Sequence, residues 1–307
     1  MANKTFILCP GQGAQAIGMA KSFYESSGVA KSVFETANAI LGFDLASICF
    51  NGPEERLNQT DISQPAIYVA GVASFRAAVE DGLIEPASIS ACAGLSLGEY
   101  TALHLAGAFS FEDGLRLVAK RGQFMQQAAV ATPSGMVAIV GGEEAAVVSI
   151  CERAAQGQVL VPANFNSPGQ IVISGAVEAC DRAAAMAESE GLKATTLAVA
   201  GAFHSPLMQS AADRMREELG KANIKKPAVL VYSNVTAQVH GEADSIRRLL
   251  VDQIVSPVRW AQTMAVVLAE SEGRFIELAP GRTLAGLARR INRKATVESL
   301  ESRRVAA

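Results

Sequence analysis

The chain has 307 residues, a net charge of −3, 50% hydrophobic residues and 19% charged residues. These values exclude a disordered chain and argue against non-specific nucleic-acid binding. The length suits one large domain, or one domain with a smaller insert. Five cysteines without paired spacing fit reduced thiols. No apolar run is long enough for a membrane span or a signal peptide, so we expect a cytoplasmic protein.

The first predicted strand, residues 5–9, ends at Pro10 and leads into Gly11-Gln12-Gly13. A nucleotide-binding loop would carry Gly-x-Gly-x-x-Gly or Gly-Lys-Ser/Thr, and both patterns are absent. The two glycines instead suit a loop that holds a main-chain N–H against a ligand.

The rest of the chain reads as alternating helices and strands, with apolar residues at helical or strand spacing. Up to residue 131 we predict helices at 18–42, 64–82 and 111–129, a strand at 88–93, and a helix from the following turn through Ala108. In the middle we predict strands at 136–140, 158–165, 171–174 and 193–199, and helices at 143–155 and 177–190. Beyond residue 200 we predict helices at 206–219, 244–254, 258–270 and 283–292, and strands at 228–232 and 274–279.

This order of elements predicts an α/β protein in two parts. The middle segment has the order βαββαβ, which is typical of a ferredoxin-like unit, so residues 132–200 are expected to form an inserted small subdomain. Residues 1–131 and 201–307 alternate strand and helix, which favours a mostly parallel sheet flanked by helices.

A strand, a sharp turn and a helix meet at Gly94-Leu95-Ser96-Leu97-Gly98. In a hydrolase-like nucleophile elbow, the glycines let strand and helix approach closely and the serine hydroxyl points out of the fold. Unpaired N–H groups at the start of the helix can then stabilise an oxyanion. Ser96 is therefore a candidate nucleophile for acyl transfer, although the pattern also fits a tight connection with an ordinary serine.

A serine nucleophile needs a base, and the chain has only three histidines. His104 lies eight residues after Ser96 in the same predicted helix, which is about 12 Å away and too far. His240 sits in a polar turn beside Gly241 and Glu242, so we expect it to be solvated. His204 remains as the candidate base, with a structural loop histidine as the alternative.

The order of these residues is unusual for a hydrolase. In α/β-hydrolases an acid lies between the serine and a histidine near the C-terminus, whereas here about a hundred residues follow His204. Arg121, on a predicted helix, is either a surface arginine or a bidentate clamp for a substrate carboxylate.

Together these segments resemble the malonyl-CoA:acyl carrier protein transacylases, the bacterial-type malonyltransferases of fatty acid synthesis. The resemblance covers nearly the whole chain and rests on six segments in the family's order: residues 10–15, 94–100, 121–125, 164–170, 201–208 and 253–260. One departure is Leu95, because the residue before the nucleophile is often histidine in this family. Leucine also occurs among close relatives, so we do not interpret it as a loss of activity.

The resemblance implies a role for each matching residue. Ser96 would be acylated, His204 would be its general base, and the main-chain carbonyl of Gln253 would orient the imidazole. The N–H groups of Gln12 and Leu97 would form the oxyanion hole, and Arg121 would pair with the malonyl carboxylate. The other substrate-binding residues implied by the resemblance are Gln12, Met125, Asn164, Asn166, Gln170 and Phe203.

The implied reaction is that of an [acyl-carrier-protein] S-malonyltransferase. It moves malonyl from malonyl-CoA to Ser96 and then to the phosphopantetheine thiol of an acyl carrier protein, without a metal or bound cofactor. Alternatives are an acyltransferase of polyketide synthesis, a malonate decarboxylase component, a serine thioesterase or esterase, and a binding module. A basic segment at 282–304 predicts a docking patch for an acidic carrier protein, made of Arg282, Arg289, Arg290, Arg293 and Lys294.

Overall fold

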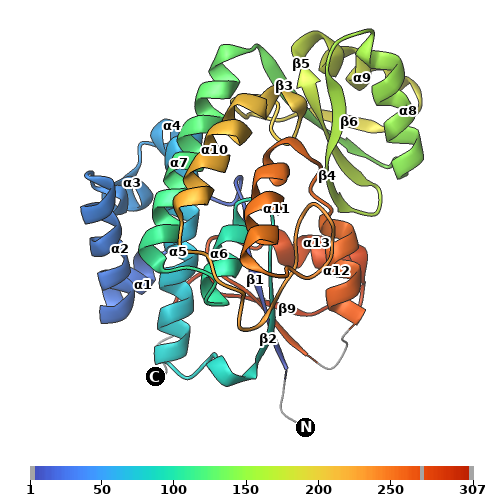
Figure 1. Ribbon diagram of the computed structural model, residues 1–307. Coiled ribbons are helices and arrows are strands. Elements are labelled where there is room, and N and C mark those ends of the chain that lie inside the picture. Colours follow the sequence, from blue (N-terminus) through green and yellow to red (C-terminus); the bar gives the residue numbers. More distant parts are fainter. Residues whose placement is uncertain (1–3, 270–272, 304–307) are drawn as a thin grey trace.

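The protein is described here from a computed structural model, which covers residues 4–269 and 273–303. Its larger sheet has five strands in the order β7-β2-β1-β8-β9, and every neighbouring pair is parallel. The strands are β1 (Thr5–Cys9), β2 (Ile89–Gly94), β7 (Leu230–Val231), β8 (Arg274–Glu277) and β9 (Val297–Ser299). The predicted parallel sheet flanked by helices is therefore confirmed (Figure 1).

Helices cover both faces of this sheet, and the alternation of side chains along β1 shows why. Ile7 and Cys9 point into one hydrophobic core, while Phe6 and Leu8 point into another. The first core is built with α2 (Gly28–Leu41), α5 (Thr60–Glu80), α6 (Gly98–Leu105), α7 (Phe111–Ala131), α10 (Gln209–Lys221) and α11 (Ala243–Val255). The second is built with α12 (Trp260–Ala269) and α13 (Thr283–Ile291).

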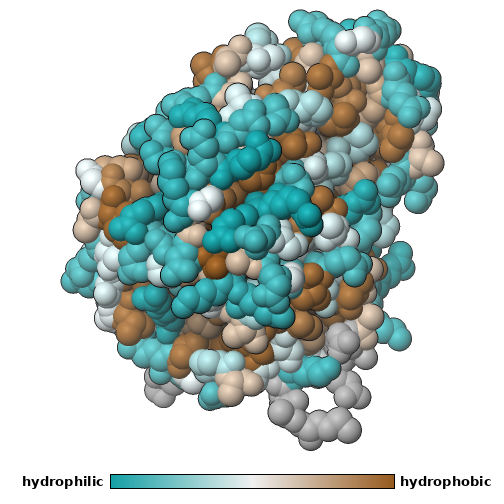
Figure 2. All heavy atoms as spheres, viewed as in Figure 1, coloured by the Kyte–Doolittle hydropathy of each residue, from teal (hydrophilic) through white to brown (hydrophobic). Residues whose placement is uncertain are grey.

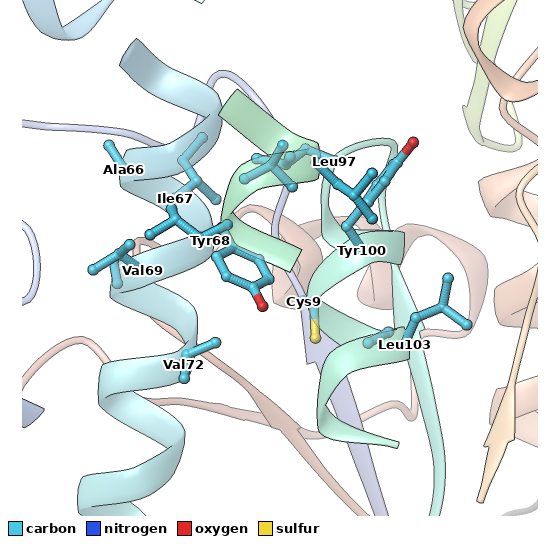
Figure 3. Packing of buried hydrophobic residues seen from close by; sticks show 14 of the residues in the cluster. Cys9, Ala66, Ile67, Tyr68, Val69, Val72, Leu97, Tyr100 and Leu103 are labelled. Atoms are coloured by element: carbon cyan, nitrogen blue, oxygen red, sulfur yellow. The ribbon is translucent and has the colours of Figure 1, made fainter. Parts of the chain in front are cut away.

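Figure 3 shows the part of the first core that lies behind the elbow. Leu97, Tyr100 and Leu103 extend from α6 and the turn before it, Cys9 from the end of β1, and residues 66–72 from α5. Because these side chains are fully or almost fully buried, they fix the position of α6 against β1 and α5.

The second sheet has four antiparallel strands in the order β4-β5-β3-β6. Its strands are β3 (Ser134–Val140), β4 (Leu160–Ser167), β5 (Gln170–Ala176) and β6 (Lys193–Thr196). Helices α8 (Glu144–Ala155) and α9 (Val177–Ser189) pack on one face, as the predicted βαββαβ order requires. The exact division of the chain at residues 132 and 200 stays a prediction.

Several predicted elements differ from the structure. The expected helix at 18–42 is two helices, α1 (Lys21–Ser26) and α2, because Ser27 is extended at φ −128° and its side chain caps α2 at the Ala30 N–H. Helix α5 begins at Thr60 rather than Gln64, and the helix expected from Pro206 opens with the 3-10 turn η2 (Pro206–Met208). The expected end of α12 at Glu270 lies outside the described residues. The elements that we did not predict are α3 (Leu45–Asn51), α4 (Glu54–Leu57), η1 (Pro86–Ser88) and β9.

On the face drawn in Figure 2, hydrophilic residues cover most of the surface and hydrophobic residues form separate smaller patches. Within residues 4–269 and 273–303, no helix is both long and apolar enough to span a bilayer.

Candidate active site

The turn after β2 is a nucleophile elbow in geometry as well as in sequence. Ser96 has a left-handed backbone at φ +52°, a strained conformation that is often found at functional sites. A Cβ on Gly94 would lie 1.9 Å from the carbonyl carbon of Gly98, and a Cβ on Gly98 would lie 2.1 Å from the carbonyl oxygen of Cys9. Only glycine fits at both positions, because strand, turn and helix are in backbone contact.

The Gly-rich loop after β1 packs directly against this turn. A Cβ on Gly11 would lie 2.2 Å from the Leu95 carbonyl oxygen, and the Leu95 N–H donates to the Cys9 carbonyl at 3.1 Å. The neighbouring N–H groups of Ser96 and Gly98 have acceptors at 2.7 and 3.0 Å. The N–H groups of Gln12 and Leu97 have no acceptor among the described residues, so both remain available to a ligand.

His204 joins the elbow from the segment that follows the small sheet. Its Nε2 lies 2.8 Å from the Ser96 Oγ, and its Nδ1 lies 2.8 Å from the main-chain carbonyl oxygen of Gln253. That carbonyl can only accept, so Nδ1 carries the proton and Nε2 can accept from the serine hydroxyl. Burial, followed by the positive charge of Arg121, lowers the pKa of His204 to about 4. The imidazole is therefore neutral at physiological pH.

Arg121 is a buried residue of the site, which excludes the alternative of a surface arginine. Its side chain is almost fully buried on α7, and Nη2 donates to the Ser96 Oγ at 3.2 Å. The guanidinium is held by two amide oxygens, that of Gln64 at 2.7 Å from Nη1 and that of Gln253 at 3.0 Å from Nη2. It also lies 5.6 Å from the ring centre of Tyr100, within the range of a cation–π contact.

The remaining predicted substrate-binding residues form no hydrogen bond to Ser96, His204 or Arg121 in the described part of the chain. Met125 is buried and its sulfur accepts from Gln64 Nε2 at 3.5 Å, while Gln12 Nε2 donates to Thr60 Oγ1 at 3.5 Å.

Three of the predicted substrate-binding residues belong to the small sheet, and a fourth, Phe203, directly precedes His204 in the chain. Asn164 forms a parallel β-bridge with Val258. The buried Oδ1 of Asn166 has no hydrogen-bond partner among the described residues. The Gln170 amide oxygen accepts a hydrogen bond from Arg290. Phe203 is buried, and its carbonyl accepts from Ser174 Oγ at 2.7 Å.

The expectation of a solvated His240 is wrong. His240 is buried, and its Nε2 lies 2.6 Å from the Oε1 of Glu99, a fully buried residue in the first turn of α6. The local sequence suggested a polar surface turn, but the segment after β7 folds back under the elbow. The contact joins residues 141 positions apart, which no local pattern reveals.

Sequence reasoning also missed three polar residues that hold the site together. Glu99 Oε2 accepts from Gln253 Nε2 at 2.7 Å and from the Asn234 N–H at 2.9 Å. Asn234 in turn accepts from the Ser96 N–H at 2.7 Å, and Gln64 anchors Arg121. One signal was present: Asn234 follows β7, the neighbour of β2, and polar residues beyond the carboxyl ends of parallel strands often line a site.

His104 contributes to packing instead. Its Nδ1 lies 3.1 Å from the Phe109 carbonyl oxygen and its ring lies against Tyr68 and Phe111. In the described ranges, no group of three or more His, Cys, Asp or Glu side chains is arranged to hold a metal ion.

Comparisons with known proteins agree with one another. A family model described as "acyl transferase domain" matches residues 5–305. The malonyl CoA-acyl carrier protein transacylase of Escherichia coli K12 is 41% identical over 95% of this chain and 94% of its own. The solved transacylase of the same name from Coxiella burnetii is 43% identical, with a TM-score of 0.93 over 98% of this chain and 95% of its own. A malonyl-transacylase solved in complex with a type II PKS acyl-carrier protein is 37% identical, with a TM-score of 0.93 over 98% and 96%.

Proposed function

Because the chain belongs to the acyl transferase family, among the malonyl CoA-acyl carrier protein transacylases, we infer that it transfers malonyl from malonyl-CoA to an acyl carrier protein. The acceptor is the phosphopantetheine thiol of the carrier, and the product supplies fatty acid synthesis. The single observation that carries this proposal is the buried Arg121 guanidinium in hydrogen-bond contact with the Ser96 hydroxyl. It places a cation beside the nucleophile, where an acidic acyl group needs it.

The first half-reaction loads the serine. Ser96 Oγ attacks the thioester carbon as its proton passes to His204 Nε2, and the N–H groups of Gln12 and Leu97 receive the developing oxyanion. When the tetrahedral intermediate collapses, the C–S bond breaks and the coenzyme A thiolate leaves, taking up the proton from His204. The malonyl ester of Ser96 remains, with its free carboxylate on Arg121.

The second half-reaction is the same chemistry in reverse order. His204 takes the proton of the carrier thiol, the sulfur attacks the ester carbon, and the C–O bond to Ser96 breaks as the serine regains its proton. The carbonyl of Gln253 orients His204 through both steps, a task that an acid performs in hydrolases. In this mechanism, no step calls for a metal or a bound cofactor.

Intact mass measurement tests the proposal directly. Malonyl-CoA alone is expected to add one malonyl group to the protein, and later addition of carrier protein is expected to remove it. The Ser96→Ala protein is expected to take up none. If Ser96→Ala still transfers malonyl at a near-normal rate, the serine mechanism is wrong.

We propose that the carrier docks beside α13. Within residues 4–269 and 273–303, Arg289, Arg293 and Lys294 are exposed and form no ion pair, whereas Arg282 is paired with Glu301. Arg290 donates to Gln170, so α13 also contacts the small sheet. Arg303 is paired with Glu80 and Asp81 away from this helix, and Arg304 lies outside the described residues.

The cytoplasm is the place that we propose for this activity. All five cysteines are buried free thiols, and burial raises the pKa of Cys92 to about 12, so that thiol remains protonated and unreactive.

We also propose that residues 132–200 act as a subdomain that supplies one wall of the acyl site.

A further inference from the structure

The two groups that hold the Arg121 guanidinium are both uncharged. Gln64 Oε1 accepts from Nη1, and Gln253 Oε1 accepts from Nη2. Arg121 forms no ion pair with the described residues, although it is almost fully buried. Buried guanidinium groups are usually paired with carboxylates, because an uncompensated buried charge is costly.

The orientation of the Gln253 amide is fixed by its other contacts. Its Nε2 donates to the Glu99 carboxyl group at 2.7 Å and to the Ser96 carbonyl at 3.0 Å. These acceptors require the amide nitrogen on their side, so the oxygen must face Arg121. Burial lowers the pKa of Arg121 and Glu99 raises it through space, but the two Glu99 oxygens accept from His240, Gln253 and the Asn234 N–H, and no hydrogen bond or ion pair joins Glu99 to the guanidinium among the described residues.

The Gln64 side chain has little reason to be an amide other than this contact. Its nitrogen reaches only the sulfur of Met125, at 3.5 Å, which is a weak acceptor. A glutamate of nearly the same shape would keep the bond to Arg121 and add a counter-ion. The chain has the neutral side chain at a position where a charged one would fit and would pair with a buried cation.

We propose that Gln64 and Gln253 form a neutral amide cradle that holds the Arg121 guanidinium without a contacting anion among the described residues, and that this cradle determines the selection of acidic acyl groups. The inference rests on the proposed function and deepens it. The two amides orient the guanidinium without competing for its charge, so the malonyl carboxylate is the first anion to contact it. The Nε of Arg121, buried and without a partner among the described residues, is left for that contact.

The test is the Gln64→Glu variant. A carboxylate at this position would neutralise Arg121 and repel the incoming malonyl carboxylate, whereas an acetyl group has no charge to be repelled. We expect the ratio of malonyl to acetyl kcat/KM for acylation of Ser96 to fall by at least about tenfold, since like charges in contact are strongly unfavourable. The melting temperature is expected not to fall, because the variant gains an ion pair.

The matched control is Gln126→Glu. Gln126 lies on the same helix as Arg121 and accepts a hydrogen bond from the Thr60 N–H at 3.1 Å, which a carboxylate can also accept. This variant adds the same charge outside the cradle, and we expect it to keep the wild-type ratio. If both variants lower the ratio of malonyl to acetyl kcat/KM equally, any added negative charge has the same effect, and the cradle is refuted.

Gln64→Leu separates charge from geometry. It removes one anchor of the guanidinium without adding a charge, so the ratio should fall less than in Gln64→Glu. An equal or larger fall would show that the cradle acts only by positioning, which overturns the proposal. If Gln64→Glu does not fold, the proposal still requires less than a tenfold change in the ratio for Gln64→Leu, about the effect of one hydrogen bond.

The wild-type protein separates this inference from the proposed function. If wild-type Ser96 is not malonylated, the proposed function fails. If it is malonylated in preference to acetylation and Gln64→Glu keeps that preference, only the cradle fails.

Discussion

Arg121 is a buried cation beside a nucleophile, and its environment makes a specific prediction for Arg121→Ala. A bidentate guanidinium pairs with both oxygens of a carboxylate, and losing one partner of a buried charged pair costs about 2–5 kcal/mol. Malonyl transfer should therefore fall by about 30-fold or more, since 1.36 kcal/mol is a factor of ten. Acetyl transfer, measured in parallel from acetyl-CoA, should fall much less. Equal losses of malonyl and acetyl transfer would show that Arg121 has a structural role.

The pH dependence of Ser96 acylation should report the buried His204. Only the neutral imidazole can accept the serine proton, and burial lowers its pKa to about 4. The rate of malonyl loading should hold its plateau below pH 6.5 and fall as the pH approaches about 4. A midpoint at the ordinary histidine value near 6.5 would contradict the environment seen here.

The lowered pKa of His204 also makes the stability of the fold depend on pH. The unfolded chain takes up a proton at His204 near pH 6.5, whereas the folded protein does not until about pH 4. The folded state should therefore lose stability as the pH falls through that window, and below about 4 this loss should be complete.

Phe203 is buried immediately before the base, where its ring is expected to fill space beside the acyl group. A rigid ring in that place would leave no room for a branching methyl group, which would overfill the site at a cost of about 1–3 kcal/mol. Phe203→Ser should narrow the ratio of malonyl to methylmalonyl kcat/KM, chiefly by improving methylmalonyl. A competition assay with the two coenzyme A esters measures this ratio. A parallel loss of both activities would make Phe203 a packing residue.

At the scale of elements, α13 carries the test of carrier docking. Reversal of Arg289 and Arg293 to Glu should raise the KM for carrier protein and weaken its dependence on salt. Loading of Ser96 from malonyl-CoA should be unchanged, because neither residue contacts the elbow. Lys31→Glu, an exposed substitution on α2, is the control and should leave the KM alone. An unchanged KM in the α13 variant would place docking elsewhere.

Helices and strands were predicted well where their own sequence determines them and poorly where a neighbour does. Strands β1 and β2 and helix α7 are apolar at regular spacing and begin or end at clear Pro, Gly or Ser signals. The division of residues 18–42 depends on Ser27, which ends one helix and caps the next within an otherwise continuous helical pattern. Ser27 also donates to Glu80 of α5 at 2.8 Å, a contact between distant positions that the helical pattern does not reveal.

At the scale of the whole molecule, the alternation of elements sufficed to predict a parallel sheet with an antiparallel insert. The residues of the main site were predicted from six segments that together resemble one family. The structure brings Ser96, His204, Arg121 and Gln253 together from four separate segments. The supporting residues were not predictable, because Gln64, Glu99 and Asn234 form contacts across 57 to 154 positions without a motif of their own.

The Arg121 guanidinium, which no anion contacts among the described residues, links substrate to stability. A molecule that buries a cation without a contacting anion has a free-energy cost in its resting state, and an acidic acyl group on Ser96 relieves that cost only in the folded protein. The malonyl-enzyme should therefore melt at a higher temperature than the unloaded enzyme, whereas an acetyl-enzyme should gain little. In the cell, the loaded intermediate would then be the most persistent form of the protein. Its resistance to unfolding would follow the supply of malonyl-CoA.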